Sequence, residues 1–242
     1  MTGTLLNTAA VVLGGVLGTV LGDRLPVRFR QTVISGLGLF TLLYGVQMFL
    51  KTQNSMLVLA SVLVGAVLGE WWQIEKGLEW IGKALERRFM PAEDGSGAVS
   101  GQSRFLRGFM TASLVFCVGP VAILGSIQDG LTGDISLLAI KSALDLVMAL
   151  AFSASLGVGV AFSALIILAY QGGLSLLAAQ AQTLVTAPMM TEMTAVGGVL
   201  LVAVAVSGIL ELRQVRTGNM LPALIVAPLA VAVMALLGVT LP

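Results

Sequence analysis

Long apolar stretches follow one another through almost the whole chain, and only short polar connections separate them. A helix needs about 20 mostly apolar residues to cross the hydrocarbon core of a bilayer. Eight stretches approach this length, some of them loosely, and they predict an all-α fold in the lipid bilayer. We expect a polytopic transmembrane helix bundle with spans at 4–22, 31–50, 55–73, 105–127, 135–156, 157–177, 192–212 and 219–240.

The composition agrees with this prediction and excludes several kinds of chemistry. Hydrophobic residues make up 57% of the chain and charged residues 10%, whereas soluble domains average about 25% charged residues. Histidine is absent and Cys117 is the single cysteine. These counts exclude an intrachain disulfide, Cys/His zinc sites and histidine-dependent nucleophiles. We expect no cofactor and no bound metal, and without a basic stripe we expect no nucleic-acid partner.

The positive charges predict the topology. Most lysines and arginines of the chain lie in the first, third and seventh connections: Arg24, Arg28, Arg30, Lys76, Lys83, Arg87, Arg88, Arg104, Arg107, Arg213 and Arg216. Because cytoplasmic connections are enriched in Lys and Arg, these three connections are predicted to face the cytoplasm. Both termini then lie on the outer side, and the number of spans is even.

We treat residues 1–242 as a single transmembrane domain. The first three spans occupy 1–73, a cytoplasmic amphipathic helix and linker occupy 74–103, and the remaining spans occupy 104–242. The helix is predicted over 70–90, where Ile74, Leu78, Ile81 and Leu85 recur at helical spacing. It either lies on the membrane surface or packs as a solvated helix on the bundle.

Two places suggest broken spans, and a third feature suggests duplication. Gly119-Pro120 falls inside the fourth stretch, where proline kinks or breaks a helix. The segment 178–191 is too polar for a clean span and too apolar for an ordinary loop, and it could be a half-helix that re-enters the membrane; the sequence does not decide this. Similar residues close the first, third and seventh spans, at 18–23, 65–70 and 207–211. They indicate either an internal repeat or a chance match in a glycine-rich chain.

The most informative charges are Lys141 and Asp145, which share one helix face because they are four residues apart. Asp145 would lie roughly 15 Å beyond the start of its helix, close to the middle of the bilayer. A charge at that depth costs at least about 2.5–3.5 kcal/mol. The pair is therefore predicted to face protein or water. It is either a substrate or coupling-ion site or a buried structural ion pair.

Further polar candidates lie near the ends of the predicted spans. Thr191 and Glu192 could supply oxygen atoms to a cation, or Glu192 could stabilise a helix N-terminus. Gln128 and Asp129 either face an outer vestibule or begin a turn. Asn7 and Asn219 are either interhelical hydrogen-bonding residues and caps or ligands of a solute.

Three glycines in the first span, Gly14, Gly18 and Gly22, form a GxxxGxxxG pattern. Small residues at this spacing let two helix backbones approach closely. The pattern predicts either a homo-oligomer formed through these glycines or close packing within the chain.

Several motifs together resemble a known family. They are Asn7 near the start, Gln128-Asp129 followed by Gly133-Asp134, Lys141 with Asp145, Tyr170-Gln171-Gly172, the segment 191–198 and the segment 219–223. This combination resembles the YdfK/YqgA family, the domain-of-unknown-function 554 family. The resemblance covers nearly the whole chain and implies a multi-pass protein of the bacterial plasma (inner) membrane. It supplies no activity and no ligand residues.

Buried charge, broken spans and a possible repeat favour a membrane transporter or channel. The transported species would be a small solute or ion, and intramembrane carboxylates could couple its transport to H⁺ or Na⁺. A second interpretation is a non-transporting membrane scaffold or assembly factor. A third is an intramembrane aspartyl protease, which would need Asp134 and Asp145 to meet. We expect the chain not to be an enzyme.

Overall fold

The computed structural model describes the whole chain except residues 25, 90–103, 119, 179–185 and 238–242. The regular elements of the described residues are helices, as the sequence predicts. They are α1 (Thr2–Asp23), α2 (Val27–Phe49), α3 (Ser55–Trp72), α4 (Ile74–Phe89), α5 (Arg104–Cys117), α6 (Pro120–Thr132), α7 (Ser136–Leu156), α8 (Gly159–Phe162), α9 (Ala164–Leu176), α11 (Ala187–Val204), the π-helix η1 (Ala205–Ile209), the 3₁₀-helix η2 (Thr217–Met220) and α12 (Ala223–Leu236).

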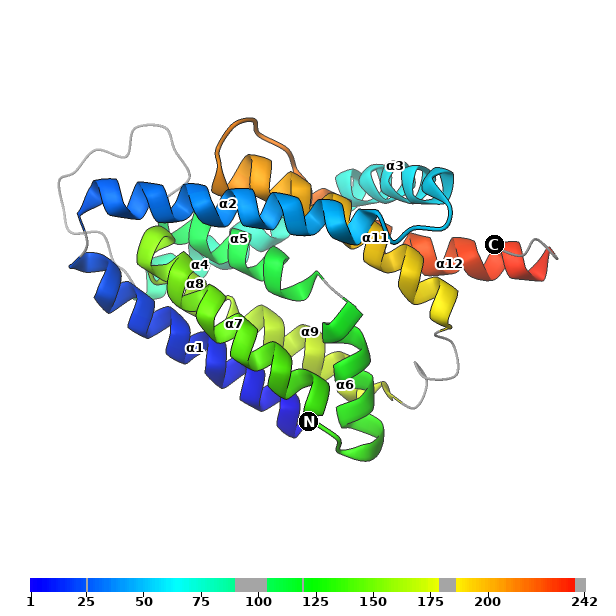
Figure 1. The fold of residues 1–242 in the computed structure, drawn as a ribbon, viewed down its shortest axis with the longest axis horizontal. Coiled ribbons are helices and arrows are strands. Elements are labelled where there is room, and N and C mark those ends of the chain that lie inside the picture. Colours follow the sequence, from blue (N-terminus) through cyan, green and yellow to red (C-terminus); the bar gives the residue numbers. More distant parts are fainter. Residues whose placement is uncertain (25, 90–103, 119, 179–185, 238–242) are drawn as a thin grey trace.

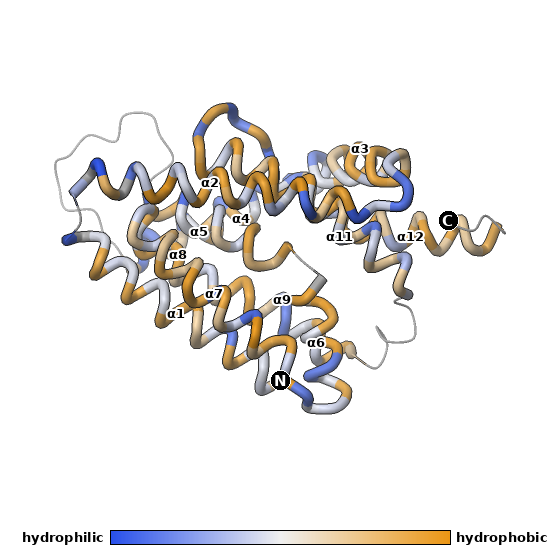
Figure 2. Tube along the Cα trace, in the orientation of Figure 1, coloured by the Kyte–Doolittle hydropathy of each residue, from blue (hydrophilic) through white to orange (hydrophobic). Residues whose placement is uncertain are grey.

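The helices form two groups that lie one above the other (Figure 1). One group holds α1, α6, α7 and α9, which pack against one another. The other holds α2, α3, α11 and α12. Helix α5 contacts members of both groups, and α2 also contacts α7, so the two groups share one interior. Figure 2 shows the helices as mainly hydrophobic, with hydrophilic residues gathered at helix ends and connections.

Among the described residues, seven helical segments are long and apolar enough to cross a membrane, and the number is eight if the bent pair of α5 and α6 forms one span. The predicted fourth span is thus not one continuous helix, because the axes of α5 and α6 differ by 66°. The change of direction falls at the predicted Gly119-Pro120 position. The boundary between the fifth and sixth spans is also as predicted, since α7 ends at Leu156 and Gly157 follows with a φ of 84°.

The re-entrant interpretation of 178–191 stays untested, because residues 179–185 lie outside the described part of the chain. Residues 187–191 belong to the first turns of α11. Pro188 is compatible with this helix because the first turn has no intrahelical partner for the missing N–H. Thr191 and Glu192 are therefore helical residues and do not form an irregular loop.

The glycine pattern of α1 packs within the chain. A methyl group added at Gly14, Gly18 or Gly22 would overlap the backbone of α7, at Leu146, Leu150 and Ala154 respectively. The backbone of α7 thus covers this face of α1. The prediction of a homo-oligomer formed through these three glycines is therefore wrong, and the alternative of intrachain packing is confirmed.

The glycine contacts also give the relative directions of the helices. Gly3 lies beside Leu138 and Gly22 beside Ala154, so α1 and α7 run parallel. Helices α3 and α12 run antiparallel, because Gly65 lies against Ala223 and Gly69 against Asn219. These directions agree with a chain that crosses the membrane alternately. Below, "outer" and "cytoplasmic" name the ends of the bundle in the topology predicted from the positive charges.

Helix α4 packs along the bundle through its apolar face. Gly82 is buried, and a side chain there would meet Leu106 and Phe109 of α5. Trp72 and Trp80 are exposed, as expected of tryptophans at a membrane interface. The structure thus confirms an amphipathic helix that packs on the bundle.

The segments 65–70 and 207–211, which have similar sequences, do not have the same local structure. Helix α3 ends at Trp72 and leads through Gln73, in the left-handed conformation, directly into α4. Helix α11 instead continues into η1 and then an irregular connection over 210–216. The matched residues at the ends of these two spans therefore fold differently.

Candidate functional site

A set of buried polar side chains fills the interface of α1, α6 and α9 near the outer end of the bundle. We call these residues the polar column: Thr4, Asn7, Ser126, Asp129, Gln171 and Ser175. Each helix contributes two of them, three or four residues apart, so that both lie on one helix face. None of the six is more than 5% exposed.

Asp129 forms the outer end of the column. Its carboxylate accepts hydrogen bonds from the backbone N–H groups of Gly3 (3.0 Å) and Thr4 (3.3 Å) and from the amine of Met1 (3.0 Å). A carboxylate in this position satisfies the unpaired N–H groups of the first helical turn and stabilises the positive end of the helix dipole. Asp129 therefore anchors the start of α1 on α6, and Figure 1 shows the N-terminus beside α6.

Gln128 points away from the column. Its amide donates a 2.6 Å hydrogen bond to Asp134, which also accepts hydrogen bonds from the Ser136 hydroxyl and backbone N–H. The hydrogen bonds from the Ser136 side chain and backbone hold the pKa of Asp134 below its ordinary value. Gln128 thus lies in the last turns of α6 and holds the turn that leads to α7 through its bond to Asp134.

Hydroxyl groups connect the three helices in the middle of the column. The Ser175 hydroxyl donates a 2.9 Å hydrogen bond to the backbone carbonyl of Ser126. The Thr4 and Ser175 hydroxyl oxygens are 3.3 Å apart. Because the Ser175 proton is engaged with Ser126, Thr4 is the donor in this second bond.

The column continues inward to two amide side chains that only partly satisfy each other. Asn7 Nδ2 donates to Gln171 Oε1 at 3.3 Å. Asn7 Oδ1 and Gln171 Nε2 are buried and have no hydrogen-bond partner among the described residues. Buried polar atoms without partners are rare in native structures. One free acceptor and one free donor side by side fit a water molecule or a polar group of a solute.

Lys141 and Asp145 lie on α7, and the predicted ion pair between them is confirmed. Gly3 lies beside Leu138 and Gly14 beside Leu146, so Asn7 is level with the turn of α7 between these two positions. The ion pair is therefore about as deep as Asn7 or one turn deeper. Both charged side chains are about 90% buried, at 10% and 11% exposure.

The ion pair also lies close to the break between α5 and α6. Lys141 Nζ is 6.0 Å from the ring centroid of Phe116, in the last turn of α5. A cation over an aromatic ring gains about 0.5–2 kcal/mol. The C-terminal end of a helix also attracts a cation through its dipole. The α5 half of the interrupted span thus ends beside the buried ammonium group of Lys141.

Glu192 lies in a separate place. It is fully buried in α11, and it accepts hydrogen bonds from the Thr52 hydroxyl (2.6 Å) and the Gln53 backbone N–H (2.8 Å). Glu192 therefore fastens the connection between α2 and α3 to α11. The hydroxyl of the adjacent Thr191 donates to the carbonyl of Ala187 in its own helix.

Asn219 lies at the cytoplasmic end. Its Nδ2 donates to Glu70 at 2.6 Å, and its Oδ1 accepts a 2.8 Å hydrogen bond from the backbone N–H of Glu75. Glu70 also pairs with Arg216, and the Glu75 carboxylate accepts from the Gly218 N–H. These contacts fasten η2 to the corner between α3 and α4.

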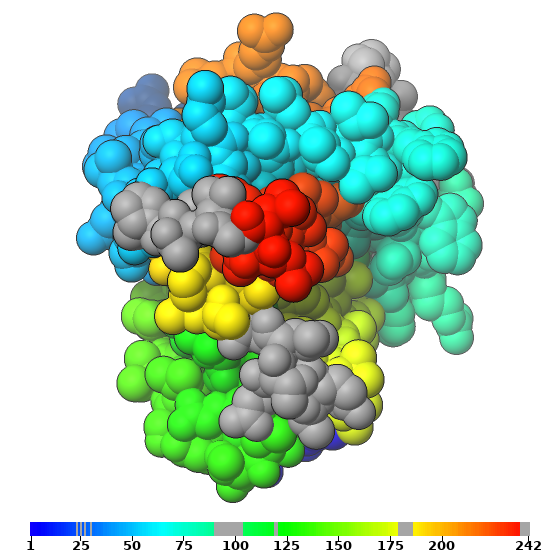
Figure 3. Space-filling view, turned by 90° about the vertical axis from the view of Figure 1, so that its right-hand side faces the viewer, coloured from blue at the N-terminus to red at the C-terminus, as the bar shows by residue number. Residues whose placement is uncertain are grey.

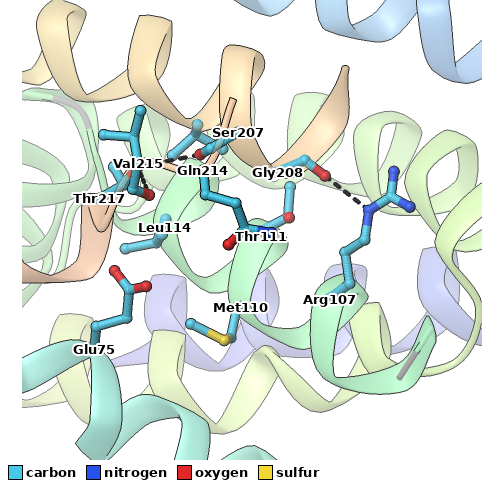
Figure 4. A pocket seen from close by; sticks show the side chains of 11 residues that line it. Glu75, Arg107, Met110, Thr111, Leu114, Ser207, Gly208, Gln214, Val215 and Thr217 are labelled. Atoms are coloured by element: carbon cyan, nitrogen blue, oxygen red, sulfur yellow. Dashed lines mark hydrogen bonds between the residues drawn. The ribbon is translucent and has the colours of Figure 1, made fainter. Parts of the chain in front are cut away.

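A small pocket beside this network was not predicted (Figure 4). It has a volume of about 70 Å³, and Glu75, Arg107, Thr111 and Gln214 are among the residues that line it. Arg107 donates to the backbone carbonyls of Gly208 and Ile209, in the π-helical turn. Burial raises the pKa of Glu75 above its ordinary value. Sequence patterns do not reveal this pocket because π-helical turns have no simple signature.

The predicted residues therefore do not surround one shared space. Asn7 and Asp129 lie in the column, Lys141 and Asp145 pair at the interrupted span, and Glu192 and Asn219 hold separate connections. The carboxylates of Asp129, Asp145 and Glu192 each have their own partners. Asp134 binds Gln128 and Ser136, whereas Asp145 pairs with Lys141. The two carboxylates that an aspartyl protease would need therefore have different partners. Sequence reasoning missed Thr4, Ser126 and Ser175 as members of the column; their spacing relative to Asn7, Asp129 and Gln171 was the available signal.

Two known proteins are similar in sequence to almost the full length of this chain. The YqgA protein of Escherichia coli strain K12, described as uncharacterized, is 35% identical over 231 residues, which cover 95% of this chain and 96% of that protein. YdfK of Bacillus subtilis strain 168, described as an uncharacterized membrane protein, is 25% identical over 237 residues, with 96% of each chain covered. No solved structure matches the chain.

A family model described as "Protein of unknown function (DUF554)" matches residues 2–232. This match covers nearly all of the helices described above. It agrees with the motif resemblance and with the membrane protein among the relatives. The chain therefore belongs to the DUF554 family of proteins of unknown function.

Proposed function

We propose that this protein is a membrane transporter for a small solute or ion. The path would run from the outer end along the polar column to the Lys141–Asp145 pair. The observation that carries the proposal is the row of buried polar groups from Asp129 to the Asn7–Gln171 amides, together with a buried ion pair on α7 at a similar or slightly greater depth, where one span is interrupted.

The energetics of burial support a functional interpretation. Ionisable side chains inside a membrane are costly and usually mark a path for ions, protons or substrates. The unpaired Asn7 Oδ1 and Gln171 Nε2 add a further cost without a structural benefit in this conformation. A passing polar group would satisfy both atoms, so the column suits transient occupation.

The interrupted span supports the same proposal. Transporter sites commonly lie near the bilayer midplane, where broken helices direct their ends at the site. Here α5 ends beside Lys141, and α6 begins the outer half of the span. Protonation of Asp145 would release Lys141 from its partner. A proton or a competing cation at Asp145 is thus the proposed coupling event.

A carrier fits better than an open channel. The six residues of the column are at most 5% exposed, and the side chains of Lys141 and Asp145 are 10% and 11% exposed. In the conformation described here, these groups are therefore enclosed by the helices. Transport would require a second conformation, in which α5 and α6 move relative to α7 and α9.

The test is a flux assay with purified full-length protein in liposomes, screened over Na⁺, K⁺, protons, small anions and amino acids. We expect at least one species to move down its gradient, and Asp145→Asn to reduce that flux by at least tenfold. Glu79→Gln is the matched control, because Glu79 pairs with Lys83 on α4 outside the column. Flux that is unchanged in Asp145→Asn would contradict the proposed path, and no flux of any species would favour a scaffold.

A further inference from the structure

A second, larger cavity lies between the two groups of helices and is distinct from the polar column. Its volume is about 530 Å³, and residues of α4, α5, α6, α9, α11 and α12 line it. Its walls are almost entirely apolar and include Ile123, Leu174, Met190, Met193 and Leu224. In Figure 3 the end of α12 faces the viewer, between the band of α2 and α3 and the lower group of helices.

The burial of the lining residues shows that the cavity opens to the outside. At its base, Leu114, Met190 and Met193 are at most 8% exposed. On another side, Trp72 and Ile225 are 63% and 65% exposed. Both of these residues lie in or at the end of membrane-spanning helices. The opening therefore faces the hydrocarbon region and its cytoplasmic edge.

An apolar space of this size needs an occupant. Protein interiors contain few voids larger than one water molecule. Water is a poor occupant, because a buried water needs two to four polar partners and these walls offer few. Lipid acyl chains are the apolar molecules that surround an opening at this depth. The volume also falls within the range of about 300–1,000 Å³ that is typical of small-molecule sites.

Residues at the cytoplasmic side of the cavity suit the level of the lipid headgroups. Trp71 and Trp80 are exposed next to the lining residues Trp72 and Leu78. Tryptophans are enriched at membrane–water interfaces. A lipid whose headgroup lies at this level could place one acyl chain in the cavity.

We propose that this cavity binds one acyl chain of a phospholipid from the cytoplasmic leaflet, with the chain between α12 and α9. The bound chain fills the space between the two helix groups. This inference is independent of the transport proposal, because neither Lys141 nor Asp145 lines the cavity.

The first test is photo-crosslinking of the full-length protein in vesicles of phosphatidylethanolamine and phosphatidylglycerol. A trace of phosphatidylethanolamine carries a diazirine near the end of one acyl chain, and mass spectrometry locates the adducts. We expect adducts at Met190, Met193 and Leu174 to exceed those at the exposed Leu43 and Leu63 at least fivefold. Adducts spread in proportion to exposure would overturn the proposal, since they would show only lipids around the outside of the bundle.

The second test narrows the cavity. Leu174→Trp places a larger ring in its wall, and we expect at least a fivefold loss of adducts at Met193. Leu43→Trp is the matched control, because Leu43 is 67% exposed on α2 and does not line the cavity. If Leu174→Trp fails to fold, Cys117→Phe supplies the same obstruction from α5. Unchanged labelling of Met193 in a folded cavity variant would also overturn the proposal.

Discussion

Asn7 of α1 and Gln171 of α9 meet inside the bundle, where one amide hydrogen bond of 3.3 Å joins two fully buried side chains. Each amide keeps one atom without a partner among the described residues. In a soluble protein such a pair would fix helix register. Here its position between Asp129 and the ion pair makes it the narrow, incompletely satisfied part of the proposed path.

Replacing Asn7 and Gln171 separately and together should distinguish their contribution to stability from their contribution to transport. Asn7→Leu alone leaves Gln171 without its partner, and we expect a loss of about 1–3 kcal/mol. The double variant Asn7→Leu/Gln171→Leu removes both polar groups and should return to within about 1 kcal/mol of the wild type. Thermal unfolding in detergent measures stability, and liposome flux should stay lost in both variants. Normal flux in the folded double variant would exclude these amides from the path.

The Lys141–Asp145 pair allows a similar comparison of single and double variants. Asp145→Asn or Lys141→Met alone leaves one buried charge unpaired, and we expect each to destabilise the protein by about 3–5 kcal/mol. The double variant Lys141→Met/Asp145→Leu should recover most of this loss, because two apolar side chains no longer require compensation. A purely structural pair predicts that the double variant also recovers flux. The proposed coupling role predicts that it folds and remains inactive.

The packing of α1 on α7 predicts unequal effects for two glycine substitutions. Gly18→Val forces a branched side chain into the backbone of Leu150, so we expect a loss of about 1–3 kcal/mol or more. Gly36→Val on α2 is the control, since a side chain at Gly36 meets nothing within 4 Å. Unfolding temperatures in detergent compare the two variants. Equal unfolding temperatures would contradict the close contact between α1 and α7.

The hydrogen bonds of Glu192 should protect the connection between α2 and α3 from proteolysis. Glu192→Ala removes both hydrogen bonds that hold Thr52 and Gln53, at a cost of about 1.5–3 kcal/mol for each bond to the charged group. We expect trypsin to cleave after the neighbouring Lys51 at least tenfold faster, as followed by mass spectrometry. Thr191→Ala on the same helix should leave this rate unchanged. Cleavage at the wild-type rate in Glu192→Ala would show that other contacts hold the connection.

Glu75 predicts a pH dependence of stability. Burial raises the pKa of Glu75 above the unfolded value of 4.5, so the folded state binds the proton more tightly. Below pH 4.5 the carboxyl is protonated in both states and this group has no effect on stability relative to glutamine. As the pH rises through the raised pKa, the wild type loses stability because a buried carboxylate must ionise.

The variant Glu75→Gln lacks this ionisation and keeps an oxygen acceptor for the Gly218 N–H. Its unfolding temperature relative to the wild type should therefore increase between about pH 4 and about pH 8. Differential scanning fluorimetry across this range measures the difference. A relative unfolding temperature that falls with rising pH would show that Arg216 and the Gly218 hydrogen bond outweigh burial.

The amino-acid sequence by itself determined the membrane helix bundle and the breaks at Gly119-Pro120 and Gly157. Length and apolarity decide which segments can cross a bilayer, and Pro120 and Gly157 limit helices through local backbone geometry. The i,i+4 spacing of Lys141 and Asp145 also determined their ion pair, because both residues lie on one helix. These are local properties, and local physics was sufficient to predict them.

Only the tertiary structure decided which polar residues meet. The partners of Asp129, Glu192 and Asn219 lie more than 120 residues away in the chain. Their pairing depends on how α1, α2 and α3 pack against helices of the second half. The glycines of α1 show the same limit, since their spacing predicts a close helix contact but does not specify the partner. That partner is α7, because the surfaces of two helices must match in three dimensions and a single helix carries only half of that information.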